Sequence, residues 1–152
     1  MEQFELVKRY LIRLESIYHG VPLLPHLEKE FYDDDVISFF IHCFHVKDWA
    51  INAGINKNKV EKYINSHQAL MICADFANGS KHCKITKNVR TGEQPYVGGC
   101  ERFTSRLGDE IPIMQCSYRI VCKSEIIDAL VLAKECVELW RVLLIDECVA
   151  DT

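Results

Sequence analysis

Long stretches of this chain carry apolar side chains at the spacing of one face of an α-helix. In the first stretch, Phe4, Val7, Leu14 and Ile17 recur every three to four residues, with charged side chains between them. Such stretches predict long helices at residues 2–18, 36–52, 66–82 and 124–146, and a shorter one at 59–65. Apolar residues make up 49% of the 152-residue chain, which is enough for one full core.

Residues 83–122 have a different character. Apolar residues there are interrupted by turn signals at Thr91-Gly92, Gly98-Gly99 and Gly108-Asp109. We predict a β-hairpin or small meander, with a loose loop around 90–108, and a last helix capped by Ser124. The predicted fold is therefore mainly α. It is a single four-helix-bundle domain over residues 1–152, with a β-insertion at about 83–122 before the last helix.

Composition narrows the function classes. A net charge of −4 argues against a protein that coats nucleic acid by charge alone. The chain has eight cysteines, but its charged, amphipathic N-terminal stretch is unlike a secretory signal, so we expect reduced thiols and a cytoplasmic location. No apolar run is long enough to span a membrane, and no CxxC pair indicates a zinc site. We therefore assign no metal ligands and no cofactor.

Two polar patterns lie inside otherwise apolar helical stretches. The first is His45-x-x-Asp48-Trp49-x-x-Asn52, and the second is Asp75-x-x-Asn78-x-x-Lys81-His82. Spacings of three, four and seven residues place the polar groups of each pattern on one helix face. We expect the two faces to meet. Trp49 and Trp140 both stand at core-like positions.

A shared pocket is the functional interpretation of these patterns. The candidate catalytic residues are His45, Asp48, Asp75, Asn78 and His82. A histidine would act as general acid or base, with an aspartate to fix its tautomer. The candidate binding residues are Asn52, Lys81 and Lys84. Lys81 would meet an anion such as phosphate, and Lys84 belongs to a locally basic part of the insertion.

Two other interpretations stay open at this level. The polar groups could form a hydrogen-bonded network that fixes the register of two helices and has no ligand. A metal site built from His45, Asp48, Asp75 and His82 is chemically feasible as well, although no short ligand pair such as HExxH occurs.

The stretch from Asp75 to His82 (DFANGSKH) resembles the RN-x-x-x-H region of the HEPN superfamily (higher eukaryotes and prokaryotes nucleotide-binding). The resemblance covers residues 34–82 and 124–146 and implies a compact helical bundle. Asn78 and His82 match the motif, whereas Ala77 stands where the arginine is expected. Many members are ribonucleases of toxin–antitoxin or antiviral systems and act as dimers, and others only bind. The HxxDW and DxxNGSKH patterns also resemble uncharacterised bacterial and phage proteins.

Three functions follow as hypotheses. Because the arginine is missing, the first is a HEPN-like binding or regulatory protein, linked to nucleic-acid or anti-phage biology. Its partner would be another protein, a nucleotide-like ligand or a second copy of this chain. The second is a ribonuclease or other phosphoryl-transfer enzyme that uses the His/Asp/Asn strip. The third is a metal-dependent hydrolase on the same residues.

Overall fold

The computed structural model describes residues 2–23, 31–82 and 89–150. Its helices are α1 (Glu2–His19), α2 (Phe31–Asn52), α3 (Lys57–Asn65), α4 (Gln68–His82) and α5 (Ala129–Ala150). Its strands are β1 (Val21–Pro22), β2 (Tyr96–Ser105), β3 (Ile113–Cys122) and β4 (Glu125–Asp128). Within these ranges, no helix has both the length and the apolar character that crossing a membrane requires.

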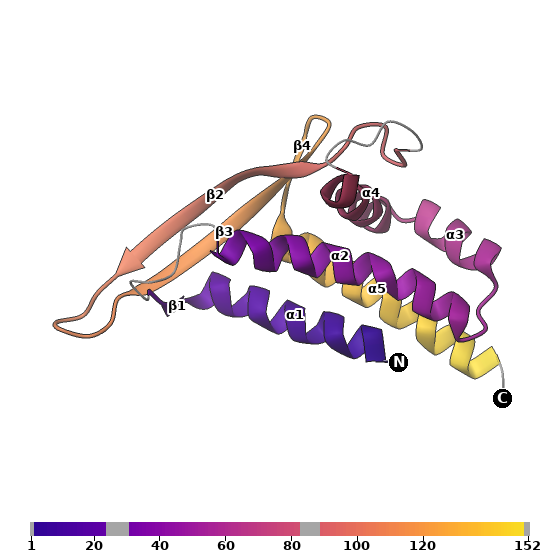
Figure 1. The fold of residues 1–152 in the computed structure, drawn as a ribbon, viewed down its shortest axis with the longest axis horizontal. Coiled ribbons are helices and arrows are strands. Elements are labelled where there is room, and N and C mark those ends of the chain that lie inside the picture. Colours follow the sequence, from indigo (N-terminus) through magenta and orange to yellow (C-terminus); the bar gives the residue numbers. More distant parts are fainter. Residues whose placement is uncertain (1, 24–30, 83–88, 151–152) are drawn as a thin grey trace.

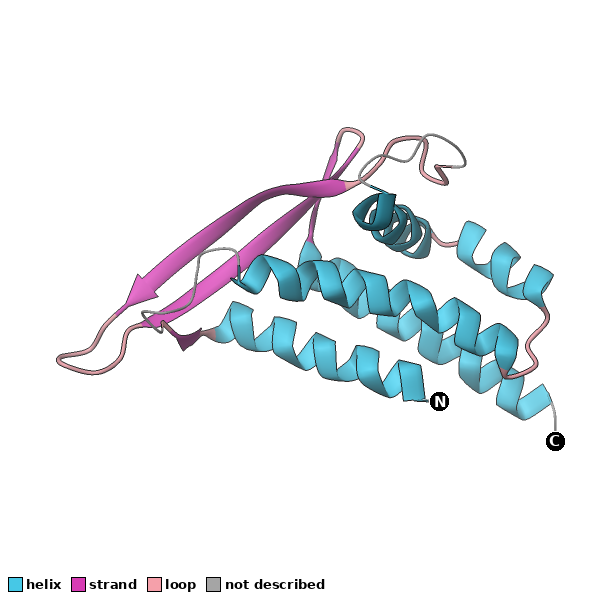
Figure 2. Cartoon of the chain, in the orientation of Figure 1, coloured by secondary structure: helices cyan, strands magenta, loops and turns pink. Residues whose placement is uncertain are grey.

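The prediction of a four-helix bundle with a small hairpin is wrong. The described residues form five helices and a four-stranded antiparallel sheet, so the fold is mixed α and β (Figures 1 and 2). β2 lies on one edge of β3, and β1 and β4 share the other edge, at the start and the end of β3 respectively. The sheet extends beyond the helices, on the side opposite to both termini (Figure 1).

β4 accounts for much of this difference. Residues 125–128 were expected inside the last helix, but they turn back through Lys123 and Ser124 and pair with β3. Lys123 adopts the left-handed conformation (φ 55°) that tight hairpin turns need. The cap of α5 is therefore Asp128 and not Ser124, because Asp128 Oδ1 accepts hydrogen bonds from the backbone N–H groups of Leu130 and Val131.

One face of β3 packs against the helices. Its buried residues alternate along the strand, as the twofold period of a β-strand requires: Met114, Cys116, Tyr118, Ile120 and Cys122. The core continues between the helices, where the largest fully buried side chains include Trp140, Phe39 and Phe40. Trp140 is thus a core residue as predicted, whereas Trp49 is 42% exposed and the core prediction for it is wrong.

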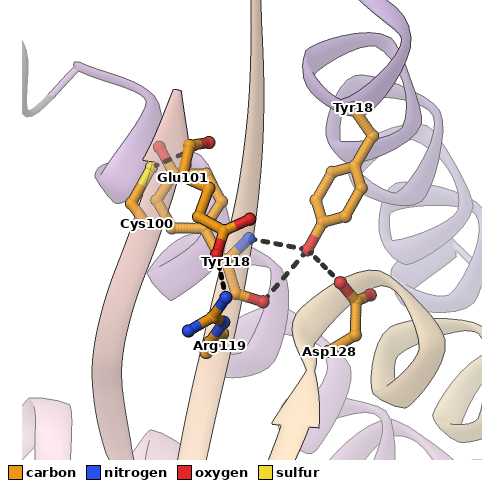
Figure 3. Close-up of polar contacts among 6 residues, drawn as sticks. All are labelled: Tyr18, Cys100, Glu101, Tyr118, Arg119 and Asp128. Atoms are coloured by element: carbon orange, nitrogen blue, oxygen red, sulfur yellow. Dashed lines mark hydrogen bonds and ion pairs between the residues drawn. The ribbon is translucent and has the colours of Figure 1, made fainter. Parts of the chain in front are cut away.

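Tyr18 joins the end of α1 to β3 and to Asp128, the last residue of β4 and the cap of α5 (Figure 3). Its hydroxyl accepts a hydrogen bond from the backbone N–H of Tyr118 at 2.9 Å. It lies 3.2 Å from both the Tyr118 carbonyl and Asp128 Oδ2, which are its two potential acceptors. Burial, together with the nearby Asp128 carboxylate, raises the pKa of Tyr18 to about 12. A single side chain therefore links three elements that are distant in sequence.

Candidate functional site

The two predicted polar faces meet at a pocket of about 520 Å³ between α2 and α4. Five residues of α2 and four of α4 line it: Ile41, Phe44, His45, Lys47, Asp48, Ala77, Asn78, Ser80 and Lys81. Four of the predicted site residues, His45, Asp48, Asn78 and Lys81, are therefore brought together. The expectation that the two faces meet holds for these four.

α2 supplies an apolar floor and a polar rim. Ile41, Phe44, His45 and Asp48 follow the i, i+3, i+4, i+7 spacing that places them along one helix face. The first two are half-buried, and the last two are exposed. The pocket therefore offers apolar contact at its base and an imidazole and a carboxylate at its edge.

α4 contributes its small and polar residues to the opposite wall. Ala77 is buried with only a methyl group, Asn78 is half-buried and Lys81 is exposed. The Ser80 hydroxyl donates to the Phe76 carbonyl at 3.0 Å, within the helix. The wall therefore presents an amide and an ammonium group beside a small apolar surface.

Lys47 belongs to a charged network next to the pocket. Its ammonium forms an ion pair with Glu61, which also accepts from Arg90 Nη2 at 2.7 Å. Burial opposes ionisation of Glu61, but hydrogen bonds from Lys47 and Arg90 outweigh it and lower the pKa of this carboxyl. The Lys47 ammonium also lies 5.4 Å from the centre of the Phe44 ring. Lys47 is thus held in place by α3 and by the pocket floor.

The other polar groups of the pocket are not bonded to one another. Across the described ranges, the side chains of Asp48, Asn78 and Lys81 make neither a hydrogen bond nor an ion pair, and the His45 ring makes an edge contact with His42 at 6.2 Å. A network that fixed helix register would satisfy these groups internally. Their open arrangement therefore argues against the network interpretation for these residues.

Asp75 does not line this pocket. It is fully buried, and its Oδ1 accepts from the backbone N–H of Arg90 at 3.0 Å. Its Oδ2 accepts from the backbone N–H of Thr91 at 2.7 Å and lies 2.8 Å from the Thr91 hydroxyl. Asp75 therefore anchors the segment that leads into β2, which is a structural role.

Asp75 and Asn78 separate because of helix geometry. They lie about 60° apart around α4, given about 100° per residue. Because α4 has neighbours on several sides, this 60° difference is enough for Asp75 to face residues 90–91 while Asn78 faces α2. Gly79, which lies about 40° from Asp75 on the side away from Asn78, faces a third neighbour, since a Cβ there would come 2.5 Å from Gln94 Nε2. Asp75, Asn78 and Gly79 therefore each face a different part of the fold.

Of the remaining predicted residues, the structure places only the side chain of Asn52. Asn52 is exposed at the last position of α2 and is not part of the lining. The side chain of His82 and the whole of Lys84 lie outside what the structure describes. A metal site of His45, Asp48 and Asp75 gains no support, because the only trio of ligand atoms that the described residues bring together is elsewhere in the fold.

Two features of this site were not predicted from the sequence. Lys47 and Ser80 line the pocket but were not singled out, although both lie beside predicted residues. Trp49 is exposed, and it stands one helical turn after His45, so both side chains belong to the same sector of α2. Its place in the HxxDW pattern is the signal that could have identified it as a surface aromatic.

No protein-family model, curated protein or solved structure matches this chain. The HEPN resemblance therefore depends on the sequence residues alone, and the pocket has to be judged by its own chemistry.

Proposed function

We propose that this chain is a HEPN-like binding protein that takes a phosphate-bearing, nucleotide-like ligand in the pocket between α2 and α4. The observation that carries the proposal is the set of unbonded polar side chains, Asp48, Asn78 and Lys81, around an apolar floor. Polar groups that have no internal partner are available to a ligand, and an apolar floor beside them suits the flat face of a base.

Each part of the ligand has a matching group. The Lys81 ammonium pairs with a phosphate, as lysines commonly do. The Asn78 amide can both donate to and accept from a base edge, and the Asp48 carboxylate accepts from a ribose hydroxyl or a base amino group. Trp49, exposed on the His45 side of α2, provides an aromatic face for stacking.

Binding is favoured over cleavage for two reasons. Ala77 lines the pocket at the position where HEPN ribonucleases, which the motif resembles, carry arginine. That position therefore offers no guanidinium to stabilise transition-state charge. Both oxygens of Asp75, the predicted partner of a catalytic histidine, are engaged by the 90–91 segment. Among the described residues, the lining therefore supplies groups that can hold a ligand but contains neither an arginine nor Asp75.

Trp49 fluorescence offers a direct test. Because Trp140 is 1% exposed and Trp49 is 42% exposed, a quench on ligand addition reports on Trp49. ATP and a short single-stranded RNA are titrated into the purified protein, with Trp49→Phe as the signal control. We expect a saturable quench, and Lys81→Gln should weaken it about tenfold or more, because one charge-assisted hydrogen bond contributes about 1.5–3 kcal/mol.

Lys8→Gln is the matched control. It removes the same charge from α1, on the other side of α2 from α4 (Figure 1), and should leave affinity unchanged. The proposal fails if neither ligand quenches Trp49, or if both lysine variants weaken binding equally. The RNA is also recovered and sized after the titration. Cleavage that His45→Ala abolishes would replace the binding function with the ribonuclease alternative.

A further inference from the structure

A second cluster of chemically active side chains lies in the core, away from the pocket. Cys43 of α2, Cys73 of α4 and Cys136 of α5 bring their Sγ atoms within 4.8 Å of one another. Their side chains are 0%, 1% and 0% exposed, and each pair of their helices is in contact. All three are free thiols. The cluster could not be predicted from the sequence because its members share no local spacing.

The sulfur positions suit a three-coordinate ion. With sulfur bonds of about 2.3 Å, the three sulfurs lie about 4 Å apart in a planar site and closer together in the pyramidal site of a centre with a lone pair, such as trivalent arsenic. Both spacings fall within the 4.8 Å limit that the three Sγ atoms meet. Thiolates select soft, thiophilic ions. Among the described residues, no fourth histidine, cysteine or carboxylate joins the trio. The cluster therefore lacks the fourth ligand that zinc usually takes.

Trp140 provides a second, independent observation. Among the described residues, its buried indole Nε1 makes no hydrogen bond of good geometry, although the Cys43 side chain lies beside it. Buried donors are nearly always satisfied, so an unpartnered one calls for an explanation. Sulfur atoms bound to a metal commonly accept hydrogen bonds from such neighbours. The Trp140 N–H is therefore placed to donate a hydrogen bond to the Sγ atom of Cys43 when that sulfur binds an ion.

The apolar surroundings restrict the charge of the ion. Three thiolates with a monovalent or divalent ion leave a net negative charge, which is costly to bury without a counter-charge. Three thiolates with a trivalent centre are neutral. We propose that Cys43, Cys73 and Cys136 form a binding site for a trivalent thiophilic centre, with arsenite, As(OH)₃, as its probe.

The reaction balances without an oxidant or reductant. Three S–H bonds and three As–O bonds break, and three As–S bonds form. Each thiol proton leaves with one arsenic hydroxyl as water, so three waters are released and arsenic stays trivalent. The Cys73 and Cys136 thiols give up only weak hydrogen bonds to the Phe40 and Ala69 carbonyls, at 3.5 and 3.4 Å. Because the site is sealed, we expect binding to be slow and to depend on local opening.

The test uses the whole chain, kept reduced by a phosphine. Arsenite is added, and native mass spectrometry and thiol titration are followed. We expect one arsenic per chain and the loss of three titratable thiols. Cys43→Ala and Cys136→Ala should each abolish this three-thiol adduct, whereas Cys100→Ala and Cys122→Ala should retain it. Circular dichroism confirms that each variant is folded, and Cys43→Ser provides a second substitution at the same position.

Several results would overturn the proposal. These are no adduct, an adduct that consumes only two thiols, and an adduct that survives in Cys43→Ala and Cys43→Ser. Parallel titrations with Cu(I) and Zn(II) test the charge argument. If either ion binds with the same cysteine dependence while arsenite does not, the assignment to a trivalent centre is wrong.

Discussion

Replacing Asp75 distinguishes a structural aspartate from a ligand-binding one. Asp75→Ala removes an acceptor that serves the backbone N–H groups of Arg90 and Thr91 and the Thr91 hydroxyl. Hydrogen bonds to a charged group contribute about 1.5–3 kcal/mol each. The free energies of these three hydrogen bonds cannot simply be added. Water can replace the lost bond at the half-buried Arg90, and alanine also removes the cost of burying a carboxylate.

The hydrogen bond to buried Thr91 alone sets a lower bound of about 1.5 kcal/mol on the stability that Asp75→Ala loses. The upper bound is about 3–5 kcal/mol, which is the cost of removing one partner of a buried charged pair. We therefore expect Asp75→Ala to lower the free energy of unfolding by about 3 kcal/mol, and Asp75→Asn, which keeps one carbonyl oxygen, by about half as much. A domain with about 5–15 kcal/mol of stability would still fold. Urea denaturation followed by circular dichroism measures both values.

Asp48→Ala is the contrasting variant, since Asp48 is exposed and has no partner among the described residues. It should change stability by no more than about 0.5 kcal/mol and should weaken ligand binding instead. The reasoning is refuted if Asp75→Ala costs less than about 1 kcal/mol and also abolishes ligand binding. That pattern would assign Asp75 to the site.

Three further variants test the ties around the site. Tyr18→Phe should cost about 1–2 kcal/mol in urea denaturation. Because the pKa of Tyr18 is raised from 10.0 to about 12, the stability that its hydroxyl contributes is complete below pH 10 and is lost as the pH rises through 12. The difference in unfolding free energy between wild type and Tyr18→Phe should therefore shrink over that range. A difference that stays unchanged would contradict this. Glu61→Gln should behave in the opposite sense. The pKa of Glu61 is lowered from 4.5, so the stability that its carboxylate contributes is present above pH 4.5 and is lost as the pH falls below it. A loss of unfolding free energy in Glu61→Gln that is equal at pH 7 and in acid would count against the Lys47–Glu61–Arg90 network. Ala77→Leu should fill the pocket from its α4 wall and lower ligand affinity about tenfold or more in calorimetry. Unchanged affinity in the folded variant would place the ligand elsewhere.

The sequence predicts the helices well because their apolar faces follow a local period. Residues 2–18, 59–65 and 66–82 were expected to be helical, and α1, α3 and α4 span 2–19, 57–65 and 68–82. Residues 125–128 were assigned wrongly because Ser124 and Asp128 are both good helix caps. Pairing with β3 decides between the two caps, and that contact comes from the tertiary fold.

The site was predictable only in part, for a similar reason. Helical spacing places His45 with Asp48 and Asn78 near Lys81, but it does not say which neighbour each side of α4 will meet. Asp75 therefore turned out to contact the 90–91 segment and not α2. Nor does spacing relate Cys43, Cys73 and Cys136, because only the packing of three helices brings them together.

Nuclear magnetic resonance titration tests the central claim most directly. Uniformly ¹⁵N-labelled protein is titrated with ATP and, separately, with a short single-stranded RNA, and amide shifts are followed. We expect saturable changes at residues 41–48 and 77–81 and at the Trp49 indole N–H, with the rest of the chain little affected. Changes centred on the hairpin of β2 and β3, or no change with either ligand, would contradict a nucleotide-binding pocket between α2 and α4.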